Sequence, residues 1–319
     1  SVFTYRRRVL KGFVPASFVF VVYYQFLLCK HFKNVCSYWS MFDIIFLENY
    51  YEKGEIAMSV QSHIDNLASK LNLKQDEKDK IEKSIATLSD RLNRYFDGEL
   101  TDHFKFGSYT RGTILPRKAD EYSDVDYMVI FKNPNNYKPQ TLLNYLKSFV
   151  NYYYHSSEIY QSHPTIVLEL NHIKFELVPA KKDIWGNIYI PSPSSSFEEW
   201  MKTDPNAFNK KLTDANMKYF YKIKPLVRLM KYWNRLNGSY LSSYELENWI
   251  VENYYWNCNN LKDFVYSTFE KLSYNYSDPQ GYKDKVDRAK KIIAQTKEYE
   301  RNNMPYLAEA EIKKLFPDF

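Results

Sequence analysis

Cysteine and glycine are both scarce in this sequence of 319 residues. Glycine occurs only 8 times, against 30 tyrosines and 21 phenylalanines. The three cysteines, Cys29, Cys36 and Cys258, form no metal-ligand pattern and cannot all pair with one another. A small, odd number of cysteines without such a pattern favours a reducing cytoplasm as the location of the protein.

A strong charge of either sign is also lacking. The net charge is +6, and residues 1–57 hold 7 Lys/Arg against 4 Asp/Glu, so the rest of the chain carries only +3. A domain that binds long duplex nucleic acid is usually more basic, and we therefore expect no stable nucleic-acid partner. Hydrophobic residues make up 45% of the chain and charged residues 26%, which excludes wholesale disorder.

Residues 1–57 differ from the rest of the chain. They hold 15 aromatic residues, three adjacent arginines and an uncharged run from Gly12 to Cys29. That run resembles a signal-peptide core or a short membrane anchor, but Pro15 and Gln25 interrupt it. Two other interpretations are a packed accessory segment and an over-extended reading frame, with the natural start at Met58. We favour the last of these.

From Met58 onward the hydrophobic pattern becomes regular. Two amphipathic helices are predicted from apolar residues at helical spacing, which are Val60, Ile64, Leu67 and Leu71 in the first and Ile81, Ile85, Leu88 and Leu92 in the second. A strand at Tyr127–Phe131 and a helix at Gln140–Tyr154 follow. The segment "TIVLELNHIKFELVPA" then predicts two strands joined by a turn at Asn171–His172.

The second half of the chain is predicted to be mostly helical. "PSPSSSFEEW" indicates a loop that leads into a helix starting at Trp200. From Leu212 onward the pattern is helical, with Pro225 as an interruption and Gly238 as a turn. The predicted fold class is α+β, with a small mixed sheet after leading helices (58–210) and a helical second lobe (211–319).

A polar motif stands directly before an apolar strand in "FGSYTRGTILPRKADEYSDVDYMVIF", Phe106–Phe131. Asp124 and Asp126 are spaced i, i+2, so in extended backbone both point to one face of the sheet. Ionised carboxylates that close repel each other unless a cation lies between them. Upstream, Gly107 permits close approach of the backbone to a ligand, and Ser108 adds a hydroxyl suited to phosphate oxygens. The pattern predicts a Mg²⁺ site beside a phosphate-binding turn.

A third carboxylate would complete such a site, and two residues are candidates. Glu169 lies in "VLEL" and Glu176 in "KFELVPA", both in extended segments with apolar neighbours. Alternation of apolar and polar residues does not choose between them. A solvent-facing strand carboxylate is the ordinary role for whichever of the two is not a ligand.

The combination "GSYTRGT…SDVDYMVI…FELVPA" resembles the nucleotidyltransferase fold of DNA polymerase beta, and more narrowly the bacterial CD-NTase family, relatives of cyclic GMP-AMP synthase. The resemblance begins near Met58 and continues through "VRLMKYWN" and "SSYELE". It implies a polymerase-beta-like core, and it makes Glu176 the third metal ligand, where Asp is commoner. It also makes Lys231 and Ser243 holders of the donor triphosphate. From its helical stripe alone, Lys231 would more ordinarily be a snorkelling lysine.

The resemblance implies an enzyme that joins nucleoside triphosphates into a cyclic di- or trinucleotide and releases pyrophosphate. Two Mg²⁺ ions, or Mn²⁺, would be its cofactors. The resemblance also implies a role in antiphage defence, in which the product, rather than the enzyme itself, acts on a downstream effector. We expect the enzyme to be a monomer. Two rival functions stay open, which are nucleotide transfer to RNA or a small molecule, and a non-catalytic, antitoxin-like binding module.

Overall fold

The computed structural model describes residues 59–133, 135–162, 164–192 and 199–319. The chain is divided after Ala57, and every described residue belongs to the second unit, Met58–Phe319. The predictions for residues 1–57 therefore lie outside the described residues. No helix in the described ranges is long and apolar enough to cross a lipid bilayer.

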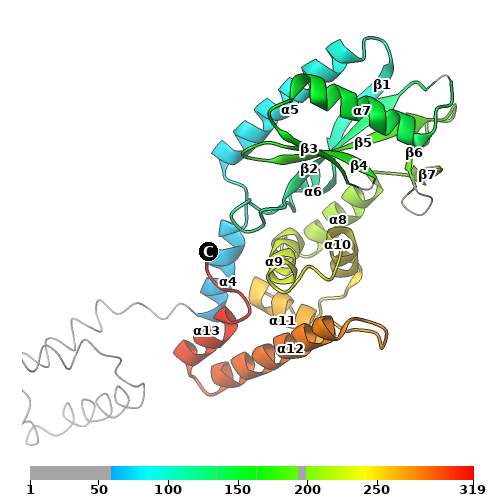
Figure 1. The fold of residues 1–319 in the computed structure, drawn as a ribbon. Coiled ribbons are helices and arrows are strands. Elements are labelled where there is room, and N and C mark those ends of the chain that lie inside the picture. The colour runs from blue at the N-terminus through cyan, green and yellow to red at the C-terminus, as the bar shows by residue number, and fades with distance from the viewer. Residues whose placement is uncertain (1–58, 134, 163, 193–198) are drawn as a thin grey trace, which may run out of the picture. The chain divides into compact units, whose positions relative to one another are not determined.

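Seven strands of the described chain form one mixed sheet, in the order β1-β2-β5-β4-β3, with β6 paired to β5 and β7 paired to β6 (Figure 1). Strands β2 and β5 are parallel, and the other pairs are antiparallel. The strands are β1 (Leu100–Phe106), β2 (Asp124–Phe131), β3 (Glu158–Ser162), β4 (Thr165–Glu169), β5 (Lys174–Lys182), β6 (Ile188–Pro191) and β7 (Trp200–Thr203).

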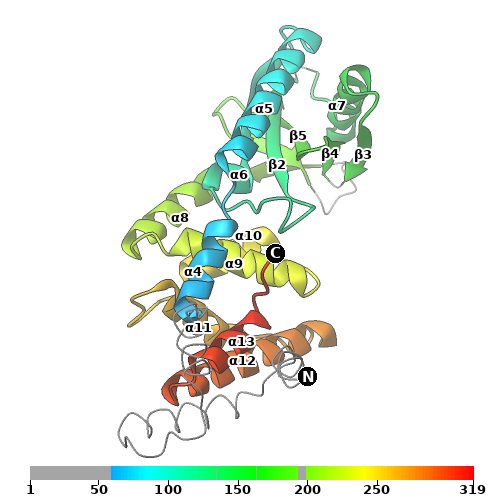
Figure 2. The same ribbon diagram turned by 90° about the vertical axis from the view of Figure 1, so that its left-hand side faces the viewer.

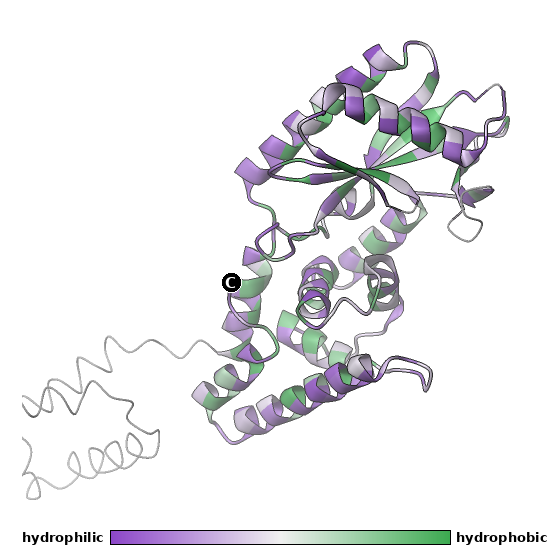
Figure 3. Ribbon diagram, in the orientation of Figure 1, coloured by the Kyte–Doolittle hydropathy of each residue, from purple (hydrophilic) through white to green (hydrophobic). Residues whose placement is uncertain are grey.

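Two helices, α5 (Gln75–Tyr95) and α7 (Pro139–Tyr153), cover one face of this sheet. Buried residues of α5 and α7 share one core with the odd-numbered residues of β2, such as Val125 and Val129. Because side chains alternate along a strand, the even-numbered residues of β2 lie on the opposite face. Figure 3 shows the strands as largely hydrophobic and α5 as largely hydrophilic, as expected for a helix that buries one stripe only.

Seven further helices of the described chain form a second hydrophobic core, in which Trp233 of α9 is 1% exposed. Helix α4 joins this core although it begins the described chain, and the C-terminal end of the chain lies beside it in both views (Figures 1 and 2). A buried hydrogen bond of 2.8 Å between His63 Nε2 and the Phe316 carbonyl fixes that contact. These helices are α4 (Val60–Lys70), α8 (Ala207–Lys218), α9 (Ile223–Leu236), α10 (Ser243–Glu252), α11 (Leu261–Lys271), α12 (Gln280–Arg301) and α13 (Pro305–Lys313).

Two local predictions are wrong. Trp200 does not start a helix but opens β7, where it pairs with Pro191 of β6 and packs against the core under α7. The partner strand β6 decides the conformation, and a partner cannot be seen in a local pattern. Pro225 does not interrupt the helices either, since it lies in the first turn of α9, where a missing N–H costs no helical hydrogen bond.

The other predicted elements are present. The two amphipathic helices are α4 and α5, and the helix at 140–154 is α7. The strand predicted at Tyr127 starts three residues earlier, at Asp124, so both aspartates lie within β2. The strands on either side of Asn171–His172 are β4 and β5.

Phe149 offers a test of the core between the sheet and α7. Its side chain is 0% exposed, with its ring centroid 5.8 Å from that of Phe96 and 5.6 Å from that of Tyr153. We expect Phe149→Ala to lower the free energy of unfolding by about 3–5 kcal/mol, because truncation leaves a cavity. Tyr152→Ala on the same helix removes a ring that is 69% exposed, and it should cost about 1 kcal/mol or less. Urea unfolding of both variants measures the difference, and equal losses would contradict the assigned packing.

Candidate active site

The parallel pairing of β2 and β5 gathers charged residues at one end of the sheet. Asp126 lies opposite Glu176, and Asp124 lies opposite Lys174. All four have even numbers, so their side chains lie on the face of the sheet that α5 and α7 leave uncovered. The i, i+2 spacing predicted that the two aspartates share one face of the strand. The pairing of β2 with β5 brings the third carboxylate, Glu176, next to them.

Glu169, the other candidate for the third carboxylate, lies one strand further away. It is on β4, opposite Lys174 in the antiparallel pairing, and so shares the same face. Its carboxylate accepts a hydrogen bond of 2.8 Å from Arg117 Nη2. Glu176 is the immediate neighbour of Asp126, whereas Glu169 is already engaged by an arginine. The geometry favours Glu176 as the third acid.

Gly107 lies against the carboxylate of Asp126. It begins the short helix α6 (Gly107–Arg111), and its φ of +71° is in the left-handed region that favours glycine. A Cβ added to Gly107 would lie 1.8 Å from Asp126 Oδ2. The predicted Gly-Ser turn is therefore the first turn of a helix that contacts Asp126, with Ser108 buried next to Gly107.

Lys174 forms ion pairs with two of the three acids at this site. Lys174 Nζ lies 3.3 Å from Asp124 Oδ2 and 3.1 Å from Glu176 Oε1. Burial, together with repulsion from the neighbouring carboxylates, raises the pKa of Asp126 above its usual value. Burial and Glu176 also raise the pKa of Asp124, and Lys174 opposes that shift. The site is a concentration of negative charge, which the Lys174 ammonium compensates by direct contact and which Lys231 and Arg111 compensate only partly from further away.

The donor set suits a hard divalent cation, since Mg²⁺ prefers carboxylate oxygens. As the side chains stand, the described residues contain no group of three His, Cys, Asp or Glu positioned to hold a metal ion. The position between Asp124 and Glu176 is nevertheless one that a cation takes, because the Lys174 ammonium lies there. The chemistry of the donor set thus fits a metal, and the ligand roles of Asp124, Asp126 and Glu176 remain predictions.

Lys231, predicted to hold a phosphate, is part of a buried ionic network. Its ammonium donates to the Thr113 carbonyl at 3.2 Å and lies 3.5 Å from Glu247 Oε1. Glu247 on α10 is 0% exposed and also accepts hydrogen bonds of 2.9 Å from Arg111 Nε and from the Thr113 hydroxyl. Lys231 is thus 8% exposed and paired, rather than snorkelling into water.

Sequence reasoning did not find Glu247 or its partner Arg111 as a linked pair. The sequence feature that could have revealed the pair is the position of Glu247, which lies beside Leu246 and Ile250 on the apolar side of a predicted helix. A carboxylate in that setting needs cationic partners. Through it, α10 and α9 are connected to the segment that follows Gly107.

The two serines at the start of α10 have different environments. Ser242 is the N-cap, and its hydroxyl accepts the Glu245 backbone N–H at 3.2 Å. Ser243 is the first helical residue and is exposed. The hydroxyl of Ser242 is used by the helix, which favours Ser243 as the residue available to a ligand.

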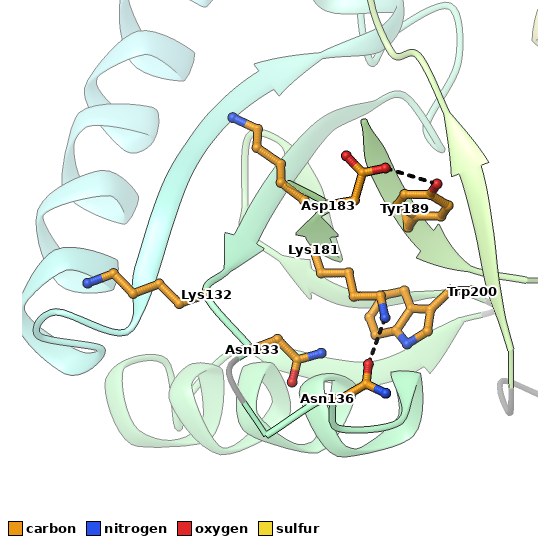
Figure 4. A pocket seen from close by; sticks show the side chains of 8 residues that line it. Lys132, Asn133, Asn136, Lys181, Asp183, Tyr189 and Trp200 are labelled. Carbon is orange, nitrogen blue, oxygen red and sulfur yellow. Dashed lines mark hydrogen bonds between the residues drawn. The ribbon is translucent and has the colours of Figure 1, made fainter. Parts of the chain in front are cut away.

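A pocket of about 310 Å³ lies at the opposite end of β2 and β5 (Figure 4). Lys181 points into it, donates to Asn136 Oδ1 at 2.9 Å and lies 5.0 Å over the Trp200 ring. Tyr189 donates to Asp183, whose carboxylate also accepts two backbone N–H groups of its own turn. None of the predicted site residues lines this pocket, so it is not the candidate active site.

A known protein family matches the region of the chain that contains the three acids and Gly107. Residues 58–216 match the domain described as Second Messenger Oligonucleotide or Dinucleotide Synthetase. The chain belongs to the bacterial CD-NTase family. The matched region contains Gly107, Asp124, Asp126 and Glu176.

Two curated relatives align with part of the chain. A probable cyclic nucleotide synthase of Bacillus cereus (strain VD146) is 33% identical over 141 residues, which cover 40% of this chain and 42% of the relative. The cyclic AMP-AMP-AMP synthase of Acinetobacter sp. (strain ATCC 27244 / 9458) is 27% identical over 171 residues, which cover 51% of this chain and 49% of the relative. The chain thus spans about half the length of the curated relatives it matches.

A solved structure supports the fold at lower sequence identity. CdnC of E. coli MS115-1, determined with ATP, superimposes with a TM-score of 0.62 at 14% identity, covering 82% of this chain and 98% of that one. The polymerase-beta-like core, with a small mixed sheet and a helical second lobe, is therefore confirmed as the fold class.

Substitutions at two glycines can distinguish the effect of backbone strain from the effect of contact with Asp126. Gly107 and Gly112 have φ of +71° and +70°, but only at Gly107 would a Cβ meet another atom. Alanine at either position should cost about 1–2 kcal/mol in backbone strain. Gly107→Ala should in addition displace the Asp126 carboxylate, and we expect it to weaken Mn²⁺ binding while Gly112→Ala leaves that binding unchanged. Calorimetric Mn²⁺ titration of both variants checks this, and equal binding would contradict the contact.

Glu247 offers a second test, because its removal leaves two cations without their acid. Breaking a buried ion pair by deleting one partner typically costs about 3–5 kcal/mol, and we expect that loss of unfolding free energy for Glu247→Ala. Glu252→Ala on the same helix breaks only an exposed pair with Lys211, and it should cost about 1 kcal/mol or less. Urea unfolding measures both. A loss for Glu247→Ala no larger than for Glu252→Ala would show that the network contributes little.

Proposed function

We propose that this chain is a cyclic oligonucleotide synthase, which joins nucleoside triphosphates into a cyclic di- or trinucleotide and releases pyrophosphate. The observation that carries the proposal is the register of β2 and β5, which places Asp126 beside Glu176 and both aspartates on one face. Three carboxylates on neighbouring strands form the donor set that two-metal phosphoryl transfer uses.

In this mechanism Asp124 and Asp126 would hold two Mg²⁺ ions, or Mn²⁺, and Glu176 would be the third ligand. Bound Mg²⁺ lowers the pKa of that hydroxyl and shields the charge on the triphosphate. The chain's own contribution is positioning. Gly107 lets the backbone come within contact of Asp126, and the buried face of β2 fixes both carboxylates on a rigid strand.

The donor triphosphate would be held by Ser108, Lys231 and Ser243. Ser108 is buried at the start of α6, and Ser243 is exposed at the start of α10. Lys231 would exchange one of its present contacts, to Thr113 or Glu247, for a phosphate oxygen. A charge-assisted contact of this kind is worth roughly 1.5–3 kcal/mol.

The names of the relatives support the choice of reaction. One is described as a probable cyclic nucleotide synthase and another as a cyclic AMP-AMP-AMP synthase. We propose nucleoside triphosphates as substrates, a monomeric enzyme in the cytoplasm, and a product that signals to a separate effector in antiphage defence. The test is to incubate the protein with labelled triphosphates and Mg²⁺, treat with phosphatase, and measure the mass of what survives.

A small phosphatase-resistant product supports the cyclic synthase. A phosphatase-sensitive or RNA-linked product would replace it with a nucleotidyltransferase that acts on RNA or a small molecule. Nucleotide binding without turnover would instead indicate a non-catalytic, antitoxin-like module.

Asp126→Asn tests the metal-dependent mechanism. Neutralising this carboxylate removes a metal ligand and also relieves repulsion from Asp124 and Glu176. Product formation should therefore fall by several orders of magnitude, since metal stabilisation supplies several kcal/mol. The Tm of the metal-free protein should stay level or rise slightly. Pyrophosphate release and thermal melting measure the two effects.

Asp102→Asn is the matched control. Asp102 lies on β1, and its carboxylate is half exposed and pairs with Lys182 at 3.6 Å, outside the cluster of acids. Its neutralisation should leave pyrophosphate release near that of the unmodified protein. Near-normal release from Asp126→Asn as well would show that Asp126 is no metal ligand in the reaction.

A further inference from the structure

Lys174 occupies an unusual position among the carboxylates. Its Nζ lies between Asp124 Oδ2 and Glu176 Oε1, at 3.3 Å and 3.1 Å. The Lys174 side chain is 11% exposed, less than the side chains of Asp124 (29%) and Glu176 (24%). A lysine at a surface ordinarily extends its side chain into water, whereas the Lys174 side chain lies back against the two acids.

The strand register explains why Lys174 lies there. It is two residues before Glu176 and directly opposite Asp124, so it shares their face of the sheet. The position follows from backbone pairing along β2 and β5 and is built into the sheet. Asp126, in contrast, contacts Gly107 and makes no ion pair with Lys174 among the described residues.

A divalent ion bridging Asp124 and Glu176 would need the position that the ammonium holds, because both cations would lie between the same two oxygens. A positive charge a few ångströms from a metal ion also repels it. Lysine and metal are therefore alternatives at this point of the site.

We propose that Lys174 is a positioning residue that acts as an internal counter-ion. It holds Asp124 and Glu176 together in the metal-free protein and is displaced when a divalent ion binds. It thereby stabilises the empty site and weakens metal binding in the absence of nucleotide. The displaced ammonium is free to meet a new anion, and the triphosphate of the proposed substrate supplies one. This inference rests on the proposed function only for the identity of that anion.

The test uses the full chain, freed of metal by dialysis against a chelator, and Mn²⁺ as the probe without nucleotide. Lys174→Met keeps most of the side-chain volume and removes the charge. We expect its Kd for Mn²⁺ to fall by about tenfold or more, because a like charge close to the ion is gone. Its metal-free Tm should fall, and Mn²⁺ should raise that Tm by more than it does in the unmodified protein.

Two further variants keep the test decisive. Lys182→Met removes a lysine from the same strand and face, but one that pairs with Asp102 away from the acids, and it should leave the Mn²⁺ Kd unchanged. Lys174→Arg keeps the positive charge, and it should bind Mn²⁺ as weakly as the unmodified protein does.

An Mn²⁺ Kd in Lys174→Met that is unchanged or higher would overturn the proposal, and so would an equal gain in Lys182→Met. If Lys174→Met does not fold, Lys174→Gln replaces it with the same expectation. The titration needs no turnover. A protein that makes no cyclic product but shows these Mn²⁺ differences would refute the proposed function and leave the counter-ion role in place.

Discussion

The pairing of β2 with β5 is the constraint on which the candidate site depends. It is the parallel pair of the sheet, and its register puts Asp126 opposite Glu176 and Asp124 opposite Lys174. A shift of one residue would turn one strand's charged side chains to the other face and bury them under α5 and α7. The apolar residues between the charged ones prevent that shift, because Val125 and Phe175 must remain in the core.

The apolar part of the two strands compensates for the repulsion among the acids. From Tyr127 to Phe131, β2 is at most 3% exposed, and Leu177 and Ala180 of β5 are fully buried. The carboxylates occupy only the first residues of each strand, where burial is incomplete. A buried hydrophobic segment thus holds the charged end of each strand in place, which is how repelling carboxylates can be held close together without unfolding the sheet.

Much of this arrangement could be predicted from sequence, and the exceptions have a common physical cause. Helical spacing found α4 and α5, and the i, i+2 spacing found the face shared by Asp124 and Asp126. The strand at Trp200, the choice between Glu169 and Glu176, and the Arg111–Glu247 pair could not be found in this way. Each depends on a partner distant in sequence, and single-sequence periodicity carries no information about partners. Resemblance to a family supplied the preference for Glu176, and the strand order explains it.

The buried Glu247 gives the helical lobe a defined relation to the acids. Its Oε2 accepts from Arg111, and its Oε1 accepts from the Thr113 hydroxyl and lies 3.5 Å from Lys231, so α6, α9 and α10 share one charged centre. Buried ion pairs rarely add much net stability over an apolar alternative, but they tolerate only one geometry. Apolar side chains at these positions would allow α9 to slide against α6. Glu247 links Lys231 to Arg111, which ends the short helix whose first residue, Gly107, contacts Asp126. The proposed reaction needs Lys231 and the acids near one another, because the donor phosphate must be held by one and attacked beside the other.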